Sequence, residues 1–232
     1  LASLPDVEVT ANRDGSASLS VHGLEFARAA GDQLEFGLSR KHPAGQSHIG
    51  ELEGIARELS RLRSPFAADP ENALYRIQPE NWLASQVRAE IRSIDPSLLP
   101  APIYGQVPAV AGGERGVLDL LAADTGGGLA VLELKASEDI HLPLQALDYW
   151  IRVEWHLRRG EFSRNGYFPG VVVAPRTPRL ILIAPALDYH PTTESVLRWF
   201  SPAIPVVRIG LGVEWRRKVQ VAFRVEGRES PC

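Results

Sequence analysis

Gly116-Val-Leu-Asp-Leu-Leu-Ala-Ala-Asp-Thr-Gly-Gly-Gly-Leu-Ala-Val-Leu-Glu-Leu-Lys135 is the stretch of sequence that decides the fold. It contains two apolar runs, 117–123 and 129–136, which are separated by a glycine-rich connector. That pattern predicts a β-hairpin buried in a sheet. Each run nevertheless carries charge at positions where a core strand should carry none, so the charged residues need an explanation.

Two acidic residues face each other in the predicted hairpin. If it closes symmetrically about Gly126, with residues 124–128 as its loop, Asp119 stands directly opposite Glu133. Opposed Cβ atoms in an antiparallel pair lie roughly 4.5–5.5 Å apart. Two carboxylates that close cannot both stay ionised in an apolar setting unless a cation lies between them. A divalent metal ion with oxygen ligands is the natural cation.

An exposed sheet face with a Glu–Lys cross-strand pair is the alternative explanation of these charges. Glu133 and Lys135 do point to the same side of the strand, because side chains alternate between its faces. The two runs are, however, nearly continuously apolar, which is typical of strands covered on both faces. We therefore favour a buried site over a solvated pair.

The hairpin and the segment after it share a combination of residues, namely Asp119, the glycine-rich turn, Glu133-Leu-Lys135 and Gln145-Ala-Leu-Asp-Tyr149. This combination resembles the PD-(D/E)xK nuclease superfamily, in particular its NucS-like and RecB-like branches with their trailing Q-x-x-x-Y. The similarity covers about residues 80–185. Leu118 replaces the proline of the named pattern. An Asp followed by Glu-x-Lys is weak evidence by itself, because acidic residues and lysines are common. The pattern becomes specific through its combination with the hairpin, the spacing and the Gln/Tyr helix.

The resemblance implies a restriction-endonuclease-like fold of the α/β (α+β) class, with a mixed central sheet flanked by helices. It also implies a metal-dependent nuclease that hydrolyses phosphodiester bonds in DNA, as an endodeoxyribonuclease. Asp119, Glu133 and the main-chain carbonyl of Leu134 would then hold Mg²⁺ or Mn²⁺. Lys135 would orient the attacking water and offset charge on the phosphorus.

Three further site residues follow from the same resemblance. Gln145 would hydrogen-bond the water or the backbone, and Tyr149 would pack against Gln145 and fix its rotamer. Glu90 falls on the apolar face of a helix predicted over 79–94, and the resemblance implies an additional acidic metal ligand from such a helix. A buried ion pair between Glu90 and Lys135 explains its position equally well.

Two other functions remain compatible with the sequence. One is a catalytically silent protein of the nuclease fold that binds DNA or a protein partner, and the other is a purely structural hairpin with an ionic core. Asp119, Glu133 and Lys135 are all present, which argues against a nuclease that has lost its catalytic residues. The acidic N-terminal portion leaves room for a protein partner.

The turn-forming residues between the periodic segments of the sequence predict two domains. Residues 1–70 read as a small β-rich module with one helix, over 49–62, and residues 71–232 as the nuclease domain. After the hairpin, the pattern predicts alternating helices and strands, at 143–158, 170–174, 180–184, 193–200, 206–210 and 219–225. This alternation indicates a mixed sheet flanked by helices.

The predicted helix at 143–158 has two apolar stripes, one on each side. Leu142, Ala146, Tyr149, Val153 and Leu157 form the first stripe, and Leu144, Leu147, Ile151 and Trp155 form the second. A helix that is apolar on both sides must be covered on both sides. The second cover is either another element of the chain or a second subunit, which would make the protein a homodimer.

The charge of the 232-residue chain is unevenly distributed around its net value of −3. Residues 1–150 hold 12 Lys/Arg and 21 Asp/Glu, a net charge of −9, whereas residues 151–232 hold 13 and 7, a net charge of +6. The basic C-terminal third is consistent with a face that contacts phosphates, so we expect DNA as a partner.

Composition also bounds the compartment. No apolar run approaches the length that crosses a bilayer, and the N-terminus lacks a signal pattern, so no membrane association is expected. The lone Cys232 excludes an internal disulfide and a cysteine-based zinc site, which favours a cytoplasmic protein. No methionine occurs, even at position 1, so we expect a processed, recombinant or partial chain.

Overall fold

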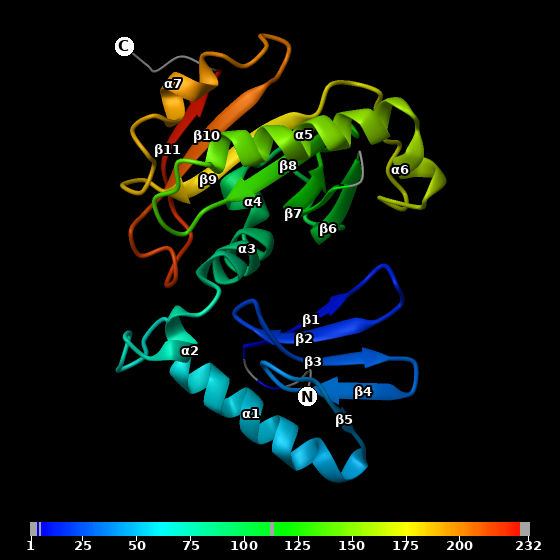
Figure 1. Cartoon of the computed structure of the whole chain (residues 1–232), viewed down its shortest axis with the longest axis vertical. Coiled ribbons are helices and arrows are strands. Elements are labelled where there is room, and N and C mark those ends of the chain that lie inside the picture. The colour runs from blue at the N-terminus through cyan, green and yellow to red at the C-terminus, as the bar shows by residue number, and fades with distance from the viewer. Residues whose placement is uncertain (1–3, 5, 112–113, 228–232) are drawn as a thin grey trace. The chain divides into compact units, whose positions relative to one another are not determined.

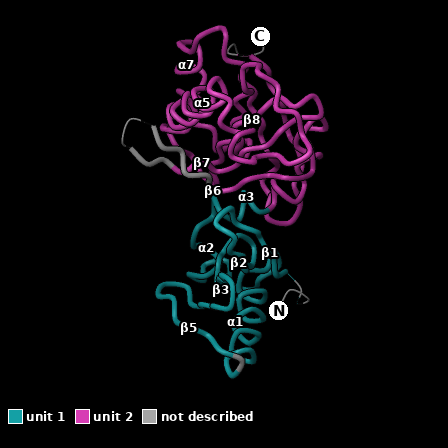
Figure 2. Tube along the Cα trace, turned by 90° about the vertical axis from the view of Figure 1, so that its right-hand side faces the viewer, with its two compact units in different colours: residues 1–85 teal, residues 86–232 magenta. Residues whose placement is uncertain are grey.

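The computed structural model describes residues 4, 6–111 and 114–227 of the chain. They form two compact units, Leu1–Ser85 and Gln86–Cys232 (Figure 2). The sequence placed the boundary at 70/71, whereas the structure divides the chain inside the helix α3 (Pro79–Ala89). Among the helices of the described residues, none combines the length and the apolar composition needed to span a membrane.

Unit 1 is a five-stranded antiparallel sheet whose strands follow one another in chain order. The strands are β1 (Val7–Ala11), β2 (Ala17–Val21), β3 (Leu24–Ala30), β4 (Gln33–Phe36) and β5 (His42–Ala44). The helix α1 (Ile49–Leu62) follows a short 3-10 turn at Gln46–His48 and lays Leu52, Ala56 and Leu59 into the core of this unit. A single helical turn, α2 (Ala73–Arg76), leads towards α3.

Unit 2 is built on a six-stranded mixed sheet in the order β11-β10-β9-β8-β7-β6 (Figure 1). The strands are β6 (Tyr104–Ala111), β7 (Glu114–Ala123), β8 (Leu129–Leu134), β9 (Arg179–Pro185), β10 (Val206–Leu211) and β11 (Val221–Glu226). β8, β9 and β10 run parallel to one another, and the other neighbouring pairs are antiparallel. The mixed sheet flanked by helices that the sequence predicts is therefore present.

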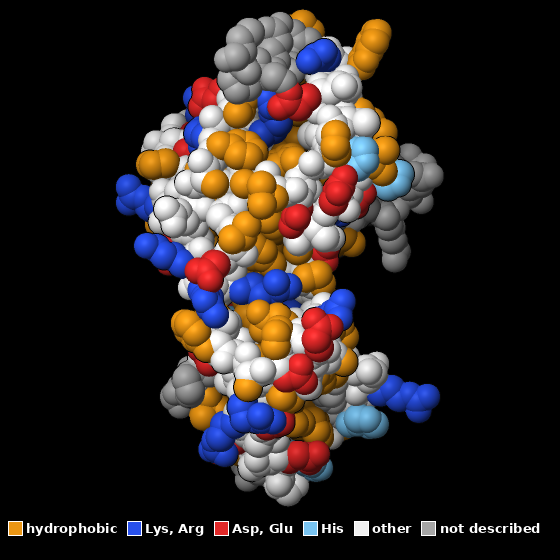
Figure 3. Space-filling model, turned by 90° about the vertical axis from the view of Figure 1, so that its left-hand side faces the viewer, with side chains coloured by type: hydrophobic (Ala, Val, Ile, Leu, Met, Phe, Trp, Pro, Cys, Tyr) orange, Lys and Arg blue, Asp and Glu red, His pale blue; other side chains and the backbone are white. Residues whose placement is uncertain are grey.

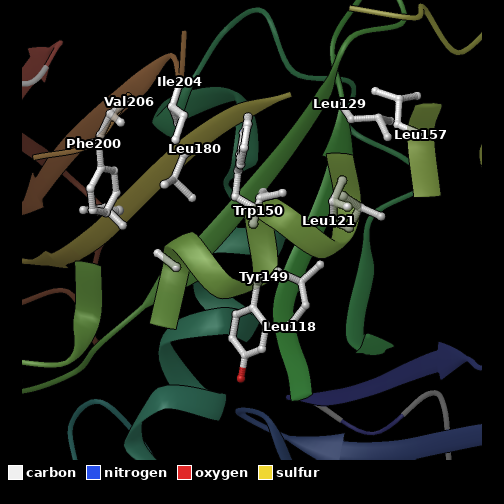
Figure 4. Close-up of a cluster of buried hydrophobic side chains, with 14 of the residues drawn as sticks. Leu118, Leu121, Leu129, Tyr149, Trp150, Leu157, Leu180, Phe200, Ile204 and Val206 are labelled. Carbon is white, nitrogen blue, oxygen red and sulfur yellow. The ribbon is translucent and has the colours of Figure 1, made fainter. Parts of the chain in front are cut away.

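One face of this sheet is covered by the long helix α5 (Leu142–Arg158), with α6 (Glu161–Arg164) and α7 (Thr193–Leu197) beside it. Figure 4 shows the core on this face, where Trp150 of α5 packs near Leu180 of β9. Leu180 and Leu182 point to α5, so Arg179 points to the other face. There Arg179 pairs with Asp95, which ends α4 (Ile91–Ile94). Helices thus lie on both faces.

The hairpin at the centre of the sheet confirms the register that the sequence predicts. Leu120 pairs with Leu132 and Ala123 with Leu129, which leaves residues 124–128 as the loop. Asp124 closes the loop, because its Oδ1 accepts hydrogen bonds from the main-chain N–H groups of Gly126 (2.8 Å) and Gly128 (2.9 Å). This loop fixes which residues of β7 and β8 face each other.

The strand expected at 170–174 is a wrong prediction. This segment forms no strand of either sheet, because its Ala174 N–H donates to Gly127 O in the hairpin loop and not to a neighbouring strand. Val172 is 90% exposed for the same reason. A run of valines is typical of strands, but it forms one only where a partner edge is available.

Replacing Gly127 by Ala should destabilise unit 2 by about 1–3 kcal/mol. Gly127 has φ +78°, and a Cβ there would lie 2.0 Å from Val172 O. Urea denaturation measures the loss. Gly126→Ala is the matched control, since the nearest atom to its Cβ is the flexible end of Arg176 at 3.2 Å. Equal stability of the two variants would contradict this account of the loop.

Candidate active site

The two carboxyl groups predicted to face each other do meet in unit 2. The register of β7 and β8, continued by one pair beyond Leu120 and Leu132, places Asp119 opposite Glu133. Asp119 Oδ2 also accepts a hydrogen bond from Leu134 N at 2.9 Å, so the Asp119 side chain lies against β8. The N–H and C=O of one strand residue point the same way, so the Leu134 carbonyl also faces the β7 side.

Glu133 is the most deeply buried of these groups, with an exposed fraction of 0%. Its two carboxylate oxygens have no hydrogen-bond donor within reach. Burial, followed by the nearby charge of Asp119, raises the pKa of Glu133 to about 9, although Lys135 acts in the opposite direction. A protonated Glu133 can share its proton with Asp119; an ionised Glu133 requires a cation.

Lys135 is the closest cation that the structure records for Glu133. Its Nζ lies 3.8 Å from Glu133 Oε1 and 3.6 Å from Asp139 Oδ2. These distances are ion-pair contacts and are too long for hydrogen bonds. The Lys135 side chain is 15% exposed, so most of it is covered by the protein.

Asp139 is a member of this cluster that the sequence analysis missed. Its Oδ1 accepts a hydrogen bond from His141 N at 2.8 Å, just before α5. Its Oδ2 is the second partner of Lys135. The only feature of the sequence that pointed to Asp139 was its position four residues after Lys135. That spacing predicts a contact between the two side chains only if the chain turns between them.

Gln145 and Tyr149 project from the first half of α5 on the side that faces the sheet. Gln145 Nε2 donates to Tyr149 Oη at 3.2 Å, so the two side chains do contact each other. Figure 4 shows the ring of Tyr149 next to Leu118, the residue before Asp119. Val131 belongs to the same core cluster, and Glu133, two residues further along β8, therefore points to the same face of the sheet.

Glu90 does not lie where the sequence predicts. The helix expected over 79–94 is broken, because α3 ends at Ala89 and Glu90 is the residue that precedes α4. Glu90 is exposed, and its Oε2 accepts a hydrogen bond from Ser93 Oγ at 3.1 Å. The prediction that Glu90 points into the core is wrong, and so is its proposed burial beside Lys135. The apolar residues keep their helical spacing across the break between α3 and α4, so the sequence gives no sign of it.

The position of α4 explains why Glu90 is separated from the acidic pair. The Asp95–Arg179 contact places the end of α4 on the face of the sheet opposite α5, whereas Glu133 points to the α5 face. Among the described residues, no group of three or more His, Cys, Asp or Glu side chains is arranged to hold a metal ion. Any metal would therefore rely on Asp119, Glu133 and main-chain oxygen.

The loops that follow β8, β9 and β10 share one edge of the sheet, because these strands are parallel. Lys135 lies on the first loop, exposed Leu187 on the second, and exposed Val213 and Lys218 on the third. Figure 3 shows the side of the molecule that is on the left in Figure 1. In unit 2, hydrophobic side chains form a central area there, bordered by Lys and Arg on one side.

Comparison with known proteins gives structural neighbours only. No family model matches the chain, and no curated protein matches it. A repair endonuclease from Pyrococcus abyssi is similar with 16% identity and a TM-score of 0.34, over 84% of this chain and 62% of that one. A complex of EndoMS with double-stranded DNA is similar with 16% identity and a TM-score of 0.30, over 83% and 60%.

This chain thus spans about three-fifths of the length of both solved structures. What the site can do is decided by the buried acidic pair on β7 and β8, the lysine beside it and the Gln–Tyr pair of α5.

Proposed function

We propose that this protein is a metal-dependent nuclease that hydrolyses phosphodiester bonds in DNA, with Asp119, Glu133 and Lys135 at its active site. The observation that carries the proposal is Glu133, a fully buried carboxyl group beside a second one, with no hydrogen-bond donor for either oxygen. A site that costs folding energy in this way is expected where function requires it.

The donor set fits Mg²⁺ or Mn²⁺. Hard cations of this kind prefer oxygen ligands, and Mg²⁺ is commonly held by one or two carboxylates together with water and substrate phosphate. Asp119 and Glu133 would supply the carboxylates and Leu134 its main-chain oxygen. When bound there, the ion would polarise a phosphate oxygen and lower the pKa of a coordinated water. Glu90, exposed beside Ser93, has no role in this proposal.

The side chains of the chain itself would position the reactants. Lys135, held between Glu133 and Asp139, would contact a phosphate oxygen, orient the attacking water and offset the negative charge that develops on the phosphoryl group. Gln145 would hydrogen-bond that water or the nearby main chain, and its bond to Tyr149 would restrict its rotamers.

Charge supports DNA as the substrate. The C-terminal part of the chain, residues 151–232, has 13 Lys/Arg and 7 Asp/Glu. Three of these cations, Arg216, Arg217 and Lys218, lie on the loop after β10, at the sheet edge that also carries Lys135. Cations placed along the edge of the site would bind the phosphate backbone and deliver a scissile phosphate to Lys135.

Titration calorimetry with Mn²⁺ and Mg²⁺ tests the proposal. Wild type should bind either ion and cleave DNA only in its presence, whereas Asp119→Asn should lose the heat of binding and the cleavage together. The matched control is Glu138→Gln, since Glu138 is an exposed acid on the loop after β8 whose ion-pair partner is His190. Equal heats for wild type and Asp119→Asn would reject the metal site.

Metal binding without cleavage of single- or double-stranded DNA would favour the catalytically silent alternative. If neither metal binding nor cleavage occurs, the hairpin has only a structural role. The three outcomes differ in two measured quantities, so the experiment separates them without reference to any related protein.

A further inference from the structure

We propose that His190 is a further DNA-binding residue of the nuclease site, and that its Nε2–H donates a hydrogen bond to a DNA phosphate next to the one that Lys135 contacts. This inference rests on the proposed function and adds a residue to it. Three observations carry it: the position of His190 near Lys135, the tautomer of its ring, and the absence of a hydrogen-bond acceptor for Nε2 among the described residues.

Two successive acidic residues on the loop after β8 connect His190 with Lys135. Asp139 Oδ2 lies 3.6 Å from Lys135 Nζ, and Glu138 Oε1 lies 3.7 Å from His190 Nε2. Because Glu138 and Asp139 are neighbours in the chain, their two partners lie on the same part of the sheet edge. Figure 3 shows histidine side chains next to acidic ones on this side of unit 2.

Tyr189 anchors the loop after β9 (residues 186–192), on which His190 lies. The Tyr189 hydroxyl donates a hydrogen bond to Leu182 O at 2.8 Å. Leu182 is the register partner of Glu133, and neighbouring strands are about 4.8 Å apart. Tyr189 is therefore attached one strand away from Glu133, and the residue that follows it is His190.

The hydrogen bonds of the His190 ring determine its tautomer. Nδ1 accepts a hydrogen bond from Thr192 N at 3.1 Å, and the Thr192 hydroxyl lies 2.7 Å from the same atom. A main-chain N–H can only donate, so Nδ1 is the acceptor and the proton of the neutral ring is on Nε2. The nitrogen that approaches the loop after β8 is therefore a donor.

This donor has no hydrogen-bond acceptor among the residues that the structure describes. Glu138 Oε1 approaches it, but 3.7 Å is too long for a hydrogen bond. The Glu138 side chain is 56% exposed, so it can turn towards solvent when another anion arrives. The His190 side chain is 26% exposed and therefore partly open to a ligand. A negatively charged phosphate oxygen is a strong acceptor for such an N–H group.

The order of the strands indicates which ligand supplies that oxygen. β9 lies between β8 and β10, so the loop of His190 lies between the loop of Lys135 and the loop that carries exposed Lys218. A DNA strand that reaches from Lys218 to Lys135 must pass the loop of His190. Neutral side chains with N–H or O–H groups contribute to phosphate binding beside Lys and Arg, and they fix the position of the backbone.

Two substitutions separate the roles of the two ring nitrogens. His190→Asn keeps an acceptor near the position of Nδ1, which can retain the turn with Thr192 N, but it has no group at the position of Nε2. His190→Gln reaches the position of Nε2 with an amide N–H, but it lacks the acceptor at Nδ1. Fluorescence anisotropy in metal-free buffer measures the affinity for DNA, and thermal melting measures stability.

We expect His190→Asn to weaken DNA binding about tenfold, as for the loss of a hydrogen bond to a charged group, and to melt as wild type does. His190→Gln should bind DNA more tightly than His190→Asn, because it restores the donor. His48→Asn is the matched control, since His48 Nδ1 also accepts from a main-chain N–H, that of Gly45 at 3.1 Å in unit 1. It should bind DNA as wild type does.

A purely structural role of His190 predicts the reverse order, with His190→Asn unchanged and His190→Gln weakened. That order would overturn the proposal, as would equal affinities of the two variants or a wild type that does not bind DNA. In cleavage assays, His190→Asn should raise KM at unchanged kcat, because the contact is made before and during the reaction. If wild type binds DNA but cleaves none with either ion, the proposed function fails, while the order of affinities still decides the role of His190.

Discussion

Lys135→Ala is expected to lower the rate of DNA cleavage by about 10²–10³-fold, while the affinity for DNA in metal-free buffer changes little. Loss of one preorganised donor to developing negative charge typically has an effect of this size. Lys135 is suited to that role because its ammonium group is held at ion-pair distance from both Glu133 and Asp139. Single-turnover kinetics and fluorescence anisotropy measure the two quantities separately.

Lys218→Ala is the control, and we expect it to affect DNA binding but not the cleavage rate. Lys218 is exposed on the loop after β10 and has no contact with the acidic pair among the described interactions. Its removal should weaken DNA binding, and the slope of log affinity against log salt should fall by about 0.9 for one lost phosphate contact. The cleavage rate at saturating DNA should stay unchanged. If Lys135→Ala weakened binding as much as cleavage in a folded protein, the separate roles proposed for the two lysines would be wrong.

The hairpin could be predicted from the sequence because three constraints act within twenty residues. A glycine-rich loop sets where the chain turns, apolar runs set the lengths of both strands, and alternation sets the face of each side chain. Together they fix the register that brings Asp119 to Glu133, as the Leu120–Leu132 pair confirms. Local constraints of this kind do not depend on the rest of the fold.

Glu90 could not be placed in the same way, because its environment depends on distant residues. The spacing of Leu83, Val87 and Ile94 continues across the helix break, so periodicity alone gives no sign of it. The face on which α4 lies is decided by Asp95, whose partners Arg179 and Arg224 are far away in the sequence. Contacts over such separations leave no pattern in a short window.

The segment 170–174 and the second apolar stripe of α5, which includes Ile151, show a second limit of pattern reasoning. Both are apolar runs with the correct period for a buried element, and both stay partly exposed in the structure. The sequence pattern shows that an apolar face should pack against something, but it does not identify the element that packs there. For Val172 the described chain offers only the hairpin loop, and Ile151 stays half exposed on α5.

Replacing Glu133 by Gln is expected to stabilise the metal-free protein by about 3 kcal/mol near pH 7. Burial and the charge of Asp119 raise the pKa of Glu133 to about 9, from an ordinary value of 4.5 in the unfolded chain. Between these values the unfolded state binds fewer protons than the folded state. The stability of wild type therefore decreases as the pH rises from about 4.5 to about 9, and Gln removes this dependence.

Urea denaturation in chelator at pH 5 and pH 8, followed by tryptophan fluorescence, measures the effect. Of the five tryptophans, only Trp82 lies in unit 1, so the signal reports mainly unit 2. The difference between Glu133→Gln and wild type should be small at pH 5 and large at pH 8, and Glu138→Gln should match wild type at both. Saturating Mg²⁺ should stabilise wild type, because the ion binds the ionised pair, and should leave Glu133→Gln unaffected. A variant less stable than wild type at pH 8 without metal would show that the buried carboxylate is already compensated by the protein. The central argument for a cation at this site would then fail.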